Sequence, residues 1–132
     1  MVKQEIRQPG KTASTGCYSA GIEMDGWLYI SGQAAEDPGT GEMMGGTTAE
    51  QTRTALRHVG AVLAAAGAGF HDVVKCTCHL AEIRDFEEFN AAYAEFFSPP
   101  MPARTTVQSG LPEGIRVEID AIARIPSKEE AP

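Results

Sequence analysis

The stretch Ile115-Arg116-Val117-Glu118-Ile119-Asp120-Ala121-Ile122-Ala123-Arg124 carries the clearest pattern in the chain. Its odd-numbered positions are all apolar, whereas most of its even-numbered positions are charged. An alternation with a period of two is typical of a β-strand that rests one face on a core and turns the other toward a wetter environment. We therefore expect this segment to be a long strand of a sheet that is covered on one side.

Further strands are expected on the N-terminal side of this segment. Apolar and β-branched residues predict strands at 73–80 and 104–108. Closer to the start, residues 18–24 and 27–30 flank Asp25-Gly26. An Asp-Gly pair between apolar segments indicates a hairpin, because Gly tolerates the positive φ of a tight turn. Residues 36–46 are rich in turn formers and predict an exposed loop.

Two helices are predicted between these strands. Thr47 and Glu50 have the spacing of a capping box, and an apolar stripe follows at positions 52, 56, 59, 63 and 66. Gly60 on that stripe is expected to allow close approach to a sheet. Asp85 and Glu88 offer a second cap, the aromatic stripe at 86, 89, 93 and 96 predicts a second helix, and Pro99-Pro100 closes it.

This order of elements predicts a single α+β domain. A hairpin, a helix, a strand, a helix and two strands contain two strand-helix-strand units, which favour a mixed sheet with two helices on one face. The domain is expected to span residues 1–132, with a frayed charged tail after about residue 126. The uncovered face of such a sheet suggests a homo-oligomer in which copies bury these faces against one another.

Composition argues against some partners. The chain has 132 residues and a formal net charge of -7, and its 11 Lys and Arg residues form no run. Proteins that bind nucleic acid concentrate basic residues on one face, so nucleic acid is not the expected partner. A local positive site for one small carboxylate stays open. Three cysteines (17, 76 and 78), no visible leader and no 18-residue apolar stretch favour a cytoplasmic location without a membrane span.

Several strings then match a known family. Gly16-Cys17-Tyr18-Ser19, Ile30-Ser31-Gly32-Gln33, Phe89-Asn90-Ala91-Ala92-Tyr93, Pro102-Ala103-Arg104-Thr105-Thr106-Val107 and Val117-Glu118-Ile119-Asp120-Ala121-Ile122-Ala123 resemble RidA/YjgF proteins, also called the L-PSP endoribonuclease family. The likeness runs from about Lys11 to Arg124. It implies a chorismate-mutase-like fold of the bacillus type and a homotrimer whose clefts lie between neighbouring subunits.

The resemblance also implies an activity. Family members hydrolyse small 2-enamine or 2-imine acids, such as 2-aminoacrylate and 2-iminobutyrate, to 2-keto acids and ammonia without a cofactor. An enamine tautomerises to an imine, water adds to the carbon, and ammonia leaves. Because the substrate also hydrolyses by itself, modest positioning and charge stabilisation suffice. The expected partner is therefore a small imine acid that carries a carboxylate.

Arg104 and Glu118 are the leading candidates for this chemistry. A guanidinium grips a planar carboxylate with two parallel donors, which a lysine cannot do. The alternative for Arg104 is an ion pair with a neighbouring Asp or Glu. Glu118 is suited to holding, orienting or deprotonating the attacking water. The alternative for Glu118 is a solvated carboxylate, or one paired with Arg116 or Arg124.

The remaining site residues follow from the resemblance. It places the hydroxyls of Tyr18 and Ser31 at the cleft and the amide of Asn90 near it, with Tyr18 counted among the catalytic groups. Gly32 is expected to let substrate approach the backbone, and the Thr106 backbone to contact the imine nitrogen. The chain departs from the family where Cys17 replaces Pro, where Thr106 replaces a frequent Cys, and at Ala20.

No metal site is expected. In a strand, Cys76 and Cys78 of the string Cys76-Thr77-Cys78-His79 point to one face and His79 to the other, and no second ligand pair has zinc spacing. Three other functions stay open: a pathway-specific deaminase of a larger imine acid, an endoribonuclease or translation inhibitor, and a non-catalytic module that binds small acids.

Overall fold

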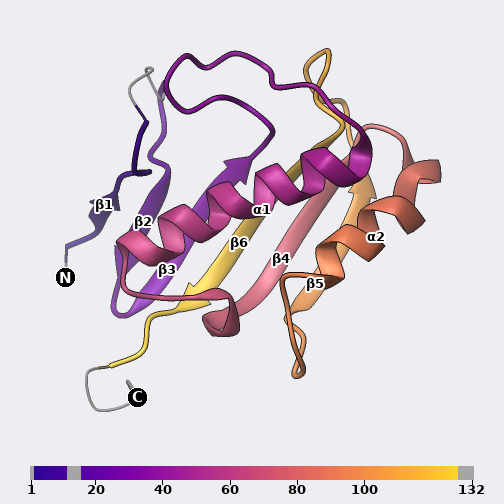
Figure 1. The fold of residues 1–132 in the computed structure, drawn as a ribbon. Coiled ribbons are helices and arrows are strands. Elements are labelled where there is room, and N and C mark those ends of the chain that lie inside the picture. The colour runs from indigo at the N-terminus through magenta and orange to yellow at the C-terminus, as the bar shows by residue number, and fades with distance from the viewer. Residues whose placement is uncertain (1, 12–15, 128–132) are drawn as a thin grey trace.

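The computed structural model describes residues 2–11 and 16–127, and these form one mixed sheet with two helices (Figure 1). Along the sheet the strands lie in the order β1-β2-β3-β6-β4-β5. Strands β4 and β5 run parallel, and the other neighbouring pairs run antiparallel. The strands are β1 (Gln4–Ile6), β2 (Gly21–Met24), β3 (Trp27–Gln33), β4 (Val73–Leu80), β5 (Ala103–Gln108) and β6 (Val117–Arg124).

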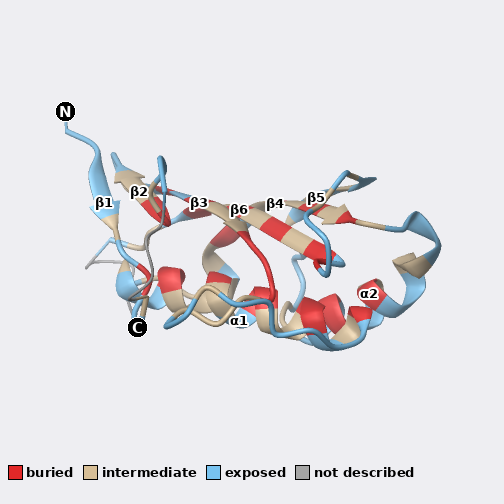
Figure 2. Cartoon of the chain, turned by 90° about the horizontal axis from the view of Figure 1, so that it is seen from above, coloured by how far each residue is buried: buried red, intermediate tan, exposed pale blue. Residues whose placement is uncertain are grey.

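Both helices cover the same face of the sheet, as Figure 2 shows from above. They are α1 (Thr48–Ala65) and α2 (Phe86–Ala94), and the 3-10 turns Phe70–Asp72 and Ile83–Asp85 precede β4 and α2. The core lies between this face and the helices, where Val117, Ile119 and Ala121 of β6 meet Leu56 and the rest of the α1 stripe. The predicted α+β class, with two helices on one face, is therefore confirmed.

The predicted strands agree closely with the observed ones. The bounds of β4 coincide with the prediction, and β6 begins two residues later than expected, at Val117. The expected first strand starts only at Gly21, because residues 18–20 approach β3 as a loop. The three-residue strand β1 was not predicted. The expected frayed tail falls mainly on residues 128–132, which lie outside the described part of the chain.

The first helix begins as predicted. Thr47 is the N-cap of α1, its hydroxyl accepts from the Glu50 amide, and the Glu50 carboxylate accepts from the Thr47 amide. Gly60 has a different role from the expected one. A Cβ there would lie 2.9 Å from the Phe70 ring, so Gly60 admits an aromatic side chain of the following turn and not the sheet.

The predicted cap of the second helix was wrong. Asp85 does precede α2, but its side chain makes no capping hydrogen bond there. Instead, Thr48 donates to the Asp85 carboxylate at 3.3 Å, and the Ala49 amide donates to the Glu88 carboxylate at 2.7 Å. Both acidic groups therefore serve the N-terminus of α1, where free amides attract negative charge.

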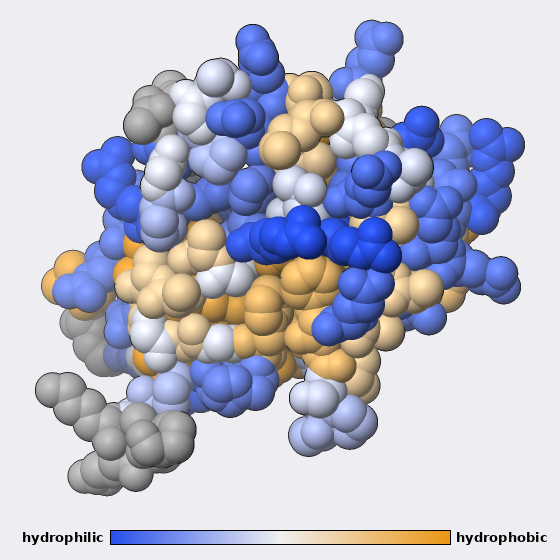
Figure 3. Space-filling model, in the orientation of Figure 1, coloured by the Kyte–Doolittle hydropathy of each residue, from blue (hydrophilic) through white to orange (hydrophobic). Residues whose placement is uncertain are grey.

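The opposite face of the sheet carries a mixed surface, and no helix of the described residues covers it. Tyr29 and Trp27 of β3 are 47% and 37% exposed, and the polar side chains of β4 and β6 alternate with the core residues of those strands. On the helix-bearing face, the apolar side chains gather at the middle within hydrophilic margins (Figure 3). No helix in the described residues is long and apolar enough to cross a bilayer.

Candidate active site

Arg104 lies on the edge strand β5 and reaches toward α2. Its Nη1 donates to the Asn90 side-chain oxygen at 2.8 Å. Its guanidinium carbon lies 4.8 Å from the Tyr93 ring centroid, 5.4 Å from that of Phe86 and 5.6 Å from that of Phe89. Such contacts fix a cation without neutralising it. Within residues 2–11 and 16–127, no carboxylate forms an ion pair with Arg104.

The strand that neighbours Arg104 supplies two buried thiols. Cys76 and Cys78 are the register partners of Arg104 and Thr106, and both are fully buried. Burial disfavours the thiolate and raises the pKa of Cys78 to about 12. These thiols are therefore inert core groups. His79 lies on the other face, as the predicted alternation requires, and in the described residues no three His, Cys, Asp or Glu side chains group as metal ligands.

Thr106 follows Arg104 on the same face of β5. Its hydroxyl oxygen is buried and has no hydrogen-bond partner within the described residues. A buried hydroxyl without a partner is uncommon and costs free energy. The expected role of Thr106, a backbone contact with an imine nitrogen, remains a proposal.

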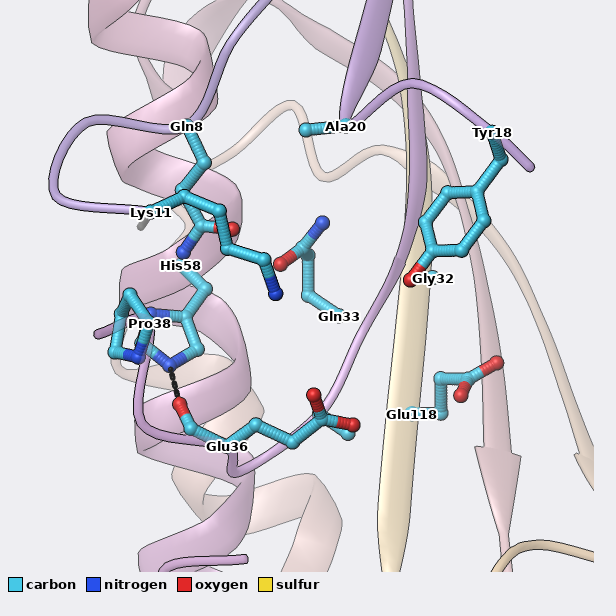
Figure 4. A pocket seen from close by; sticks show the side chains of 11 residues that line it. Gln8, Lys11, Tyr18, Ala20, Gly32, Gln33, Glu36, Pro38, His58 and Glu118 are labelled. Atoms are coloured by element: carbon cyan, nitrogen blue, oxygen red, sulfur yellow. Dashed lines mark hydrogen bonds between the residues drawn. The ribbon is translucent and has the colours of Figure 1, made fainter. Parts of the chain in front are cut away.

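Glu118 and Gly32 form a second group on the uncovered face of the sheet. Glu118 makes no ion pair with Arg116, Arg124 or any other described residue. Its carboxylate rests against Gly32: a Cβ built on Gly32 would lie 2.6 Å from Glu118 Oε2. The absence of a side chain at Gly32 is therefore what admits the Glu118 carboxylate. Tyr18 is 58% exposed, and its hydroxyl points toward Gly32 (Figure 4).

Ser31 belongs to this second group but already uses its proton. Its hydroxyl donates to the Ser19 carbonyl oxygen at 2.6 Å, which ties the Tyr18 loop to β3. Ser31 also lines the groove that runs over the uncovered face past Tyr18, Gly32 and Glu118. Within this chain, Ser31 therefore positions Tyr18 and offers an oxygen only as an acceptor.

The sequence-predicted residues thus fall into two groups that one chain does not bring together. Arg104, Asn90 and Thr106 lie on the α2 side of the sheet, because the register partners of Arg104 and Thr106 face the core. Tyr18, Ser31, Gly32 and Glu118 lie on the uncovered side. On β4, Arg104 pairs with Cys76 and Glu118 pairs with His79, which is three residues further along. The backbones of Arg104 and Glu118 are therefore about 10 Å apart along the strand direction. They are also about 10 Å apart across the sheet, because β4 lies between β5 and β6.

A polar cavity adjoins the second group and was not predicted. It has a volume of about 70 Å³ and is bordered by Tyr18, Gly32 and Glu118. On the helix side, its polar lining residues are Gln8, Lys11, Gln33, Glu36 and His58 (Figure 4). These residues come from the N-terminal segment, from β3 and the loop after it, and from α1. No spacing in the sequence indicated that they meet.

The described geometry defines a class of protein: a small α+β domain that presents an unpaired guanidinium at a sheet edge and an unpaired carboxylate on the uncovered sheet face. Comparison with known proteins agrees with this class. The family model described as Endoribonuclease L-PSP matches residues 9–125. The chain therefore belongs to this family, which is the RidA/YjgF family indicated by its motifs.

Individual relatives cover nearly the whole chain. It is 42% identical to the 2-iminobutanoate/2-iminopropanoate deaminase of Bos taurus, over 93% of this chain and 90% of the relative. The chain resembles the crystal structure of RidA from the Antarctic bacterium Psychrobacter sp., with a TM-score of 0.83 and 35% identity. The match covers 92% of this chain and 100% of that protein. The chain also resembles the crystal structure of the YjgF gene product of E. coli, with a TM-score of 0.83 and 34% identity. This match covers 93% of this chain and 99% of that protein.

Proposed function

We propose that the chain is an enzyme that hydrolyses small 2-imine and 2-enamine acids to 2-keto acids and ammonia. The observation that carries this proposal is Arg104, whose guanidinium is held by Asn90 and three aromatic rings but is not neutralised by any described carboxylate. A fixed cation with free donors suits the carboxylate of an imine acid. Relatives named as deaminases of 2-iminobutanoate and 2-iminopropanoate support an enzymatic role of this kind.

The proposed active site is shared between two copies of the chain. Arg104 and Glu118 lie on opposite faces of one sheet, so neither can serve a substrate held by the other in the same chain. A neighbouring copy whose edge strand β5 approaches the uncovered face would bring its Arg104 to the first copy's Glu118. Such a contact joins two different surfaces, and it closes into a three-membered ring when the rotation between neighbouring copies is one third of a turn. We propose a homotrimer with the chorismate-mutase-like arrangement.

The proposed reaction assigns one task to each group. Arg104 holds the carboxylate, and Glu118 orients a water molecule toward the imine carbon. The water oxygen bonds to that carbon as the C=N π electrons move to the nitrogen, and one water proton passes through the Glu118 carboxylate to the nitrogen, so that a carbinolamine forms. The hydroxyl proton then takes the same route to the nitrogen, the C–N bond breaks with its electron pair on the departing ammonia, and the C=O bond of the keto acid forms. Tyr18, from the Glu118 side of the cleft, donates a hydrogen bond to the developing oxygen.

Replacement of Arg104 tests the proposal. Arg104→Ala removes a charge-assisted bidentate contact, so kcat/KM for 2-iminobutanoate should fall by about 100-fold or more. The imine is generated in the cuvette by threonine dehydratase, and its loss is followed in a coupled assay. Analytical ultracentrifugation should show that the variant is still trimeric. Full activity in an intact Arg104→Ala trimer would defeat the assignment.

A ribonuclease function has no comparable support in the described residues. The name of the family model includes endoribonuclease, but the net charge is -7 and the uncovered face presents Glu118 and Asp120 to the groove. A polyanion would be repelled from such a surface. Salt-dependent RNA binding by highly purified protein would reverse this conclusion.

A further inference from the structure

The polar cavity beside Glu118 continues the proposed active site. Tyr18, Gly32 and Glu118 border both this cavity and the groove on the uncovered face, so a substrate held at Glu118 has the cavity next to it. One ordered water needs about 10–15 Å³ of such cavity volume, so the volume of about 70 Å³ is several times that need. The cavity therefore has room for a planar group of three or so heavy atoms.

The wall of the cavity offers both donors and acceptors. Gln8 and Gln33 are each 8% exposed and present carboxamides. Gln33 Nε2 donates to the Ser31 carbonyl oxygen at 3.1 Å, which leaves its amide oxygen as an acceptor. His58 Nε2 lies 2.8 Å from the Glu36 carbonyl oxygen, so Nε2 carries the proton of that bond. Lys11 forms no ion pair within the described residues and adds an ammonium group.

The charge of the wall selects among side chains. Lys11 contributes an ammonium group, and Glu36 and Glu118 are the two carboxylates among the lining residues. A third carboxylate would therefore add repulsion. An alkyl group would leave desolvated polar groups without partners, at about 1–3 kcal/mol for each. A carboxamide is uncharged and both donates and accepts, which matches the amides and charged groups around it.

We propose that this cavity is a side-chain subsite, and that the preferred substrates are imine acids whose side chain ends in a carboxamide. This inference rests on the proposed function: the partner copy's guanidinium holds the α-carboxylate, the imine carbon lies at Glu118, and the side chain extends past Gly32 toward Gln8 and Lys11. The carboxamide itself does not react. Gln8, Lys11 and His58 are then specificity residues that act on the choice of substrate and not on the hydrolysis.

Three isosteric substrates test the inference. An amino-acid oxidase with catalase generates the imines of L-asparagine, L-aspartate and L-leucine, and hydrolysis is measured as suppression of semicarbazone formation. The asparagine imine should have a kcat/KM about tenfold above those of the other two, since one unsatisfied polar group costs about 1–3 kcal/mol and about 1.4 kcal/mol is a factor of ten. Equal values for the three, or the leucine imine as the best substrate, would overturn the proposal.

Variants of the cavity wall extend the test. Gln8→Leu and Lys11→Met should each lower the ratio of kcat/KM for the asparagine imine to that for 2-iminobutanoate by about tenfold. Gln4→Leu on the exposed strand β1 is the matched control and should keep the wild-type ratio. An unchanged ratio in both cavity variants contradicts the subsite.

The wild-type protein separates failure of the subsite from failure of the proposed function. If the wild type hydrolyses 2-iminobutanoate but does not favour the carboxamide, only the subsite fails. If it hydrolyses no imine, the proposed function fails with it.

Discussion

Arg104 differs from other arginines of the chain in what surrounds its guanidinium. Arg53 forms a 2.9 Å ion pair with Glu95, and Arg84 lies 3.8 Å from the Glu82 carboxylate. Arg104 donates instead to the neutral amide of Asn90 and lies over aromatic rings, which orient it and leave its charge available. The alternative raised from the sequence, an internal ion pair, does not occur within the described residues.

The shape of the guanidinium is expected to matter as much as its charge. Arg104→Lys keeps the positive charge but loses the planar pair of donors and the contact with the rings. We expect kcat/KM for 2-iminobutanoate to fall by about tenfold or more in this variant, since a charge-assisted hydrogen bond is worth about 1.5–3 kcal/mol. Steady-state kinetics on the trimeric variant measure this. Wild-type kinetics would show that charge alone suffices.

Gly32 is predicted to be required by Glu118. A methyl group in Gly32→Ala would lie 2.6 Å from Glu118 Oε2 and displace the carboxylate. A displacement of about 1 Å costs about 100-fold in rate, so kcat should fall by that order. Gly110→Ala is the matched control, because nothing lies within 4 Å of a Cβ at that position. Equal activity of the two variants would remove Glu118 from the reaction.

The thiols should differ in reactivity according to burial. Cys17 is exposed, whereas burial raises the pKa of Cys76 and brings that of Cys78 to about 12. A raised pKa favours the neutral thiol, so at pH 8 neither buried cysteine supplies the reactive thiolate. A disulfide reagent should titrate one thiol in the native protein and three after denaturation. Rapid reaction of all three thiols in the native state would contradict the buried positions of Cys76 and Cys78.

At the scale of elements, the sequence predicts best where a pattern is long and one face is buried. The alternation of β6 and the capping box of α1 both appear as expected, because each is a local pattern with one structural solution. Strand β1 has only three residues, two of them exposed, so its sequence shows no alternation. Asp85 and Glu88, at the start of α2, matched a capping pattern but bind α1, because sequence spacing does not reveal that the two helix ends meet.

Glu88 is therefore expected to stabilise α1 from outside that helix. Its carboxylate accepts from the Ala49 amide in the first turn of α1. Glu88→Ala should lower the free energy of unfolding by about 1 kcal/mol, as the loss of an N-cap side chain does. Glu87→Ala, at an exposed neighbouring position of α2, controls for helix propensity. Urea denaturation measures both, and equal stabilities would contradict the bridging role.

At the scale of the whole molecule, the sequence indicated which residues to consider but not how they are grouped. Motifs pointed to Arg104 and Glu118 alike, yet their assignment to opposite faces needs the register of β4 with both neighbouring strands. The cavity could not be predicted at all, since Gln8, Gln33 and His58 meet only after the N-terminal segment and α1 fold onto the sheet. The separation of the two groups is the main reason to expect a shared site.

Subunit mixing tests this shared site most directly. Arg104→Ala and Glu118→Ala are each expected to be inactive alone, but a cleft between two copies can combine the intact Glu118 of the first variant with the intact Arg104 of the second. If the two variants are unfolded and refolded together in equal amounts, about a quarter of the clefts should contain both groups, and activity toward 2-iminobutanoate should recover to about that fraction of the wild-type value. Mixed trimers that remain as inactive as the separate variants would contradict a site built by two copies of the chain.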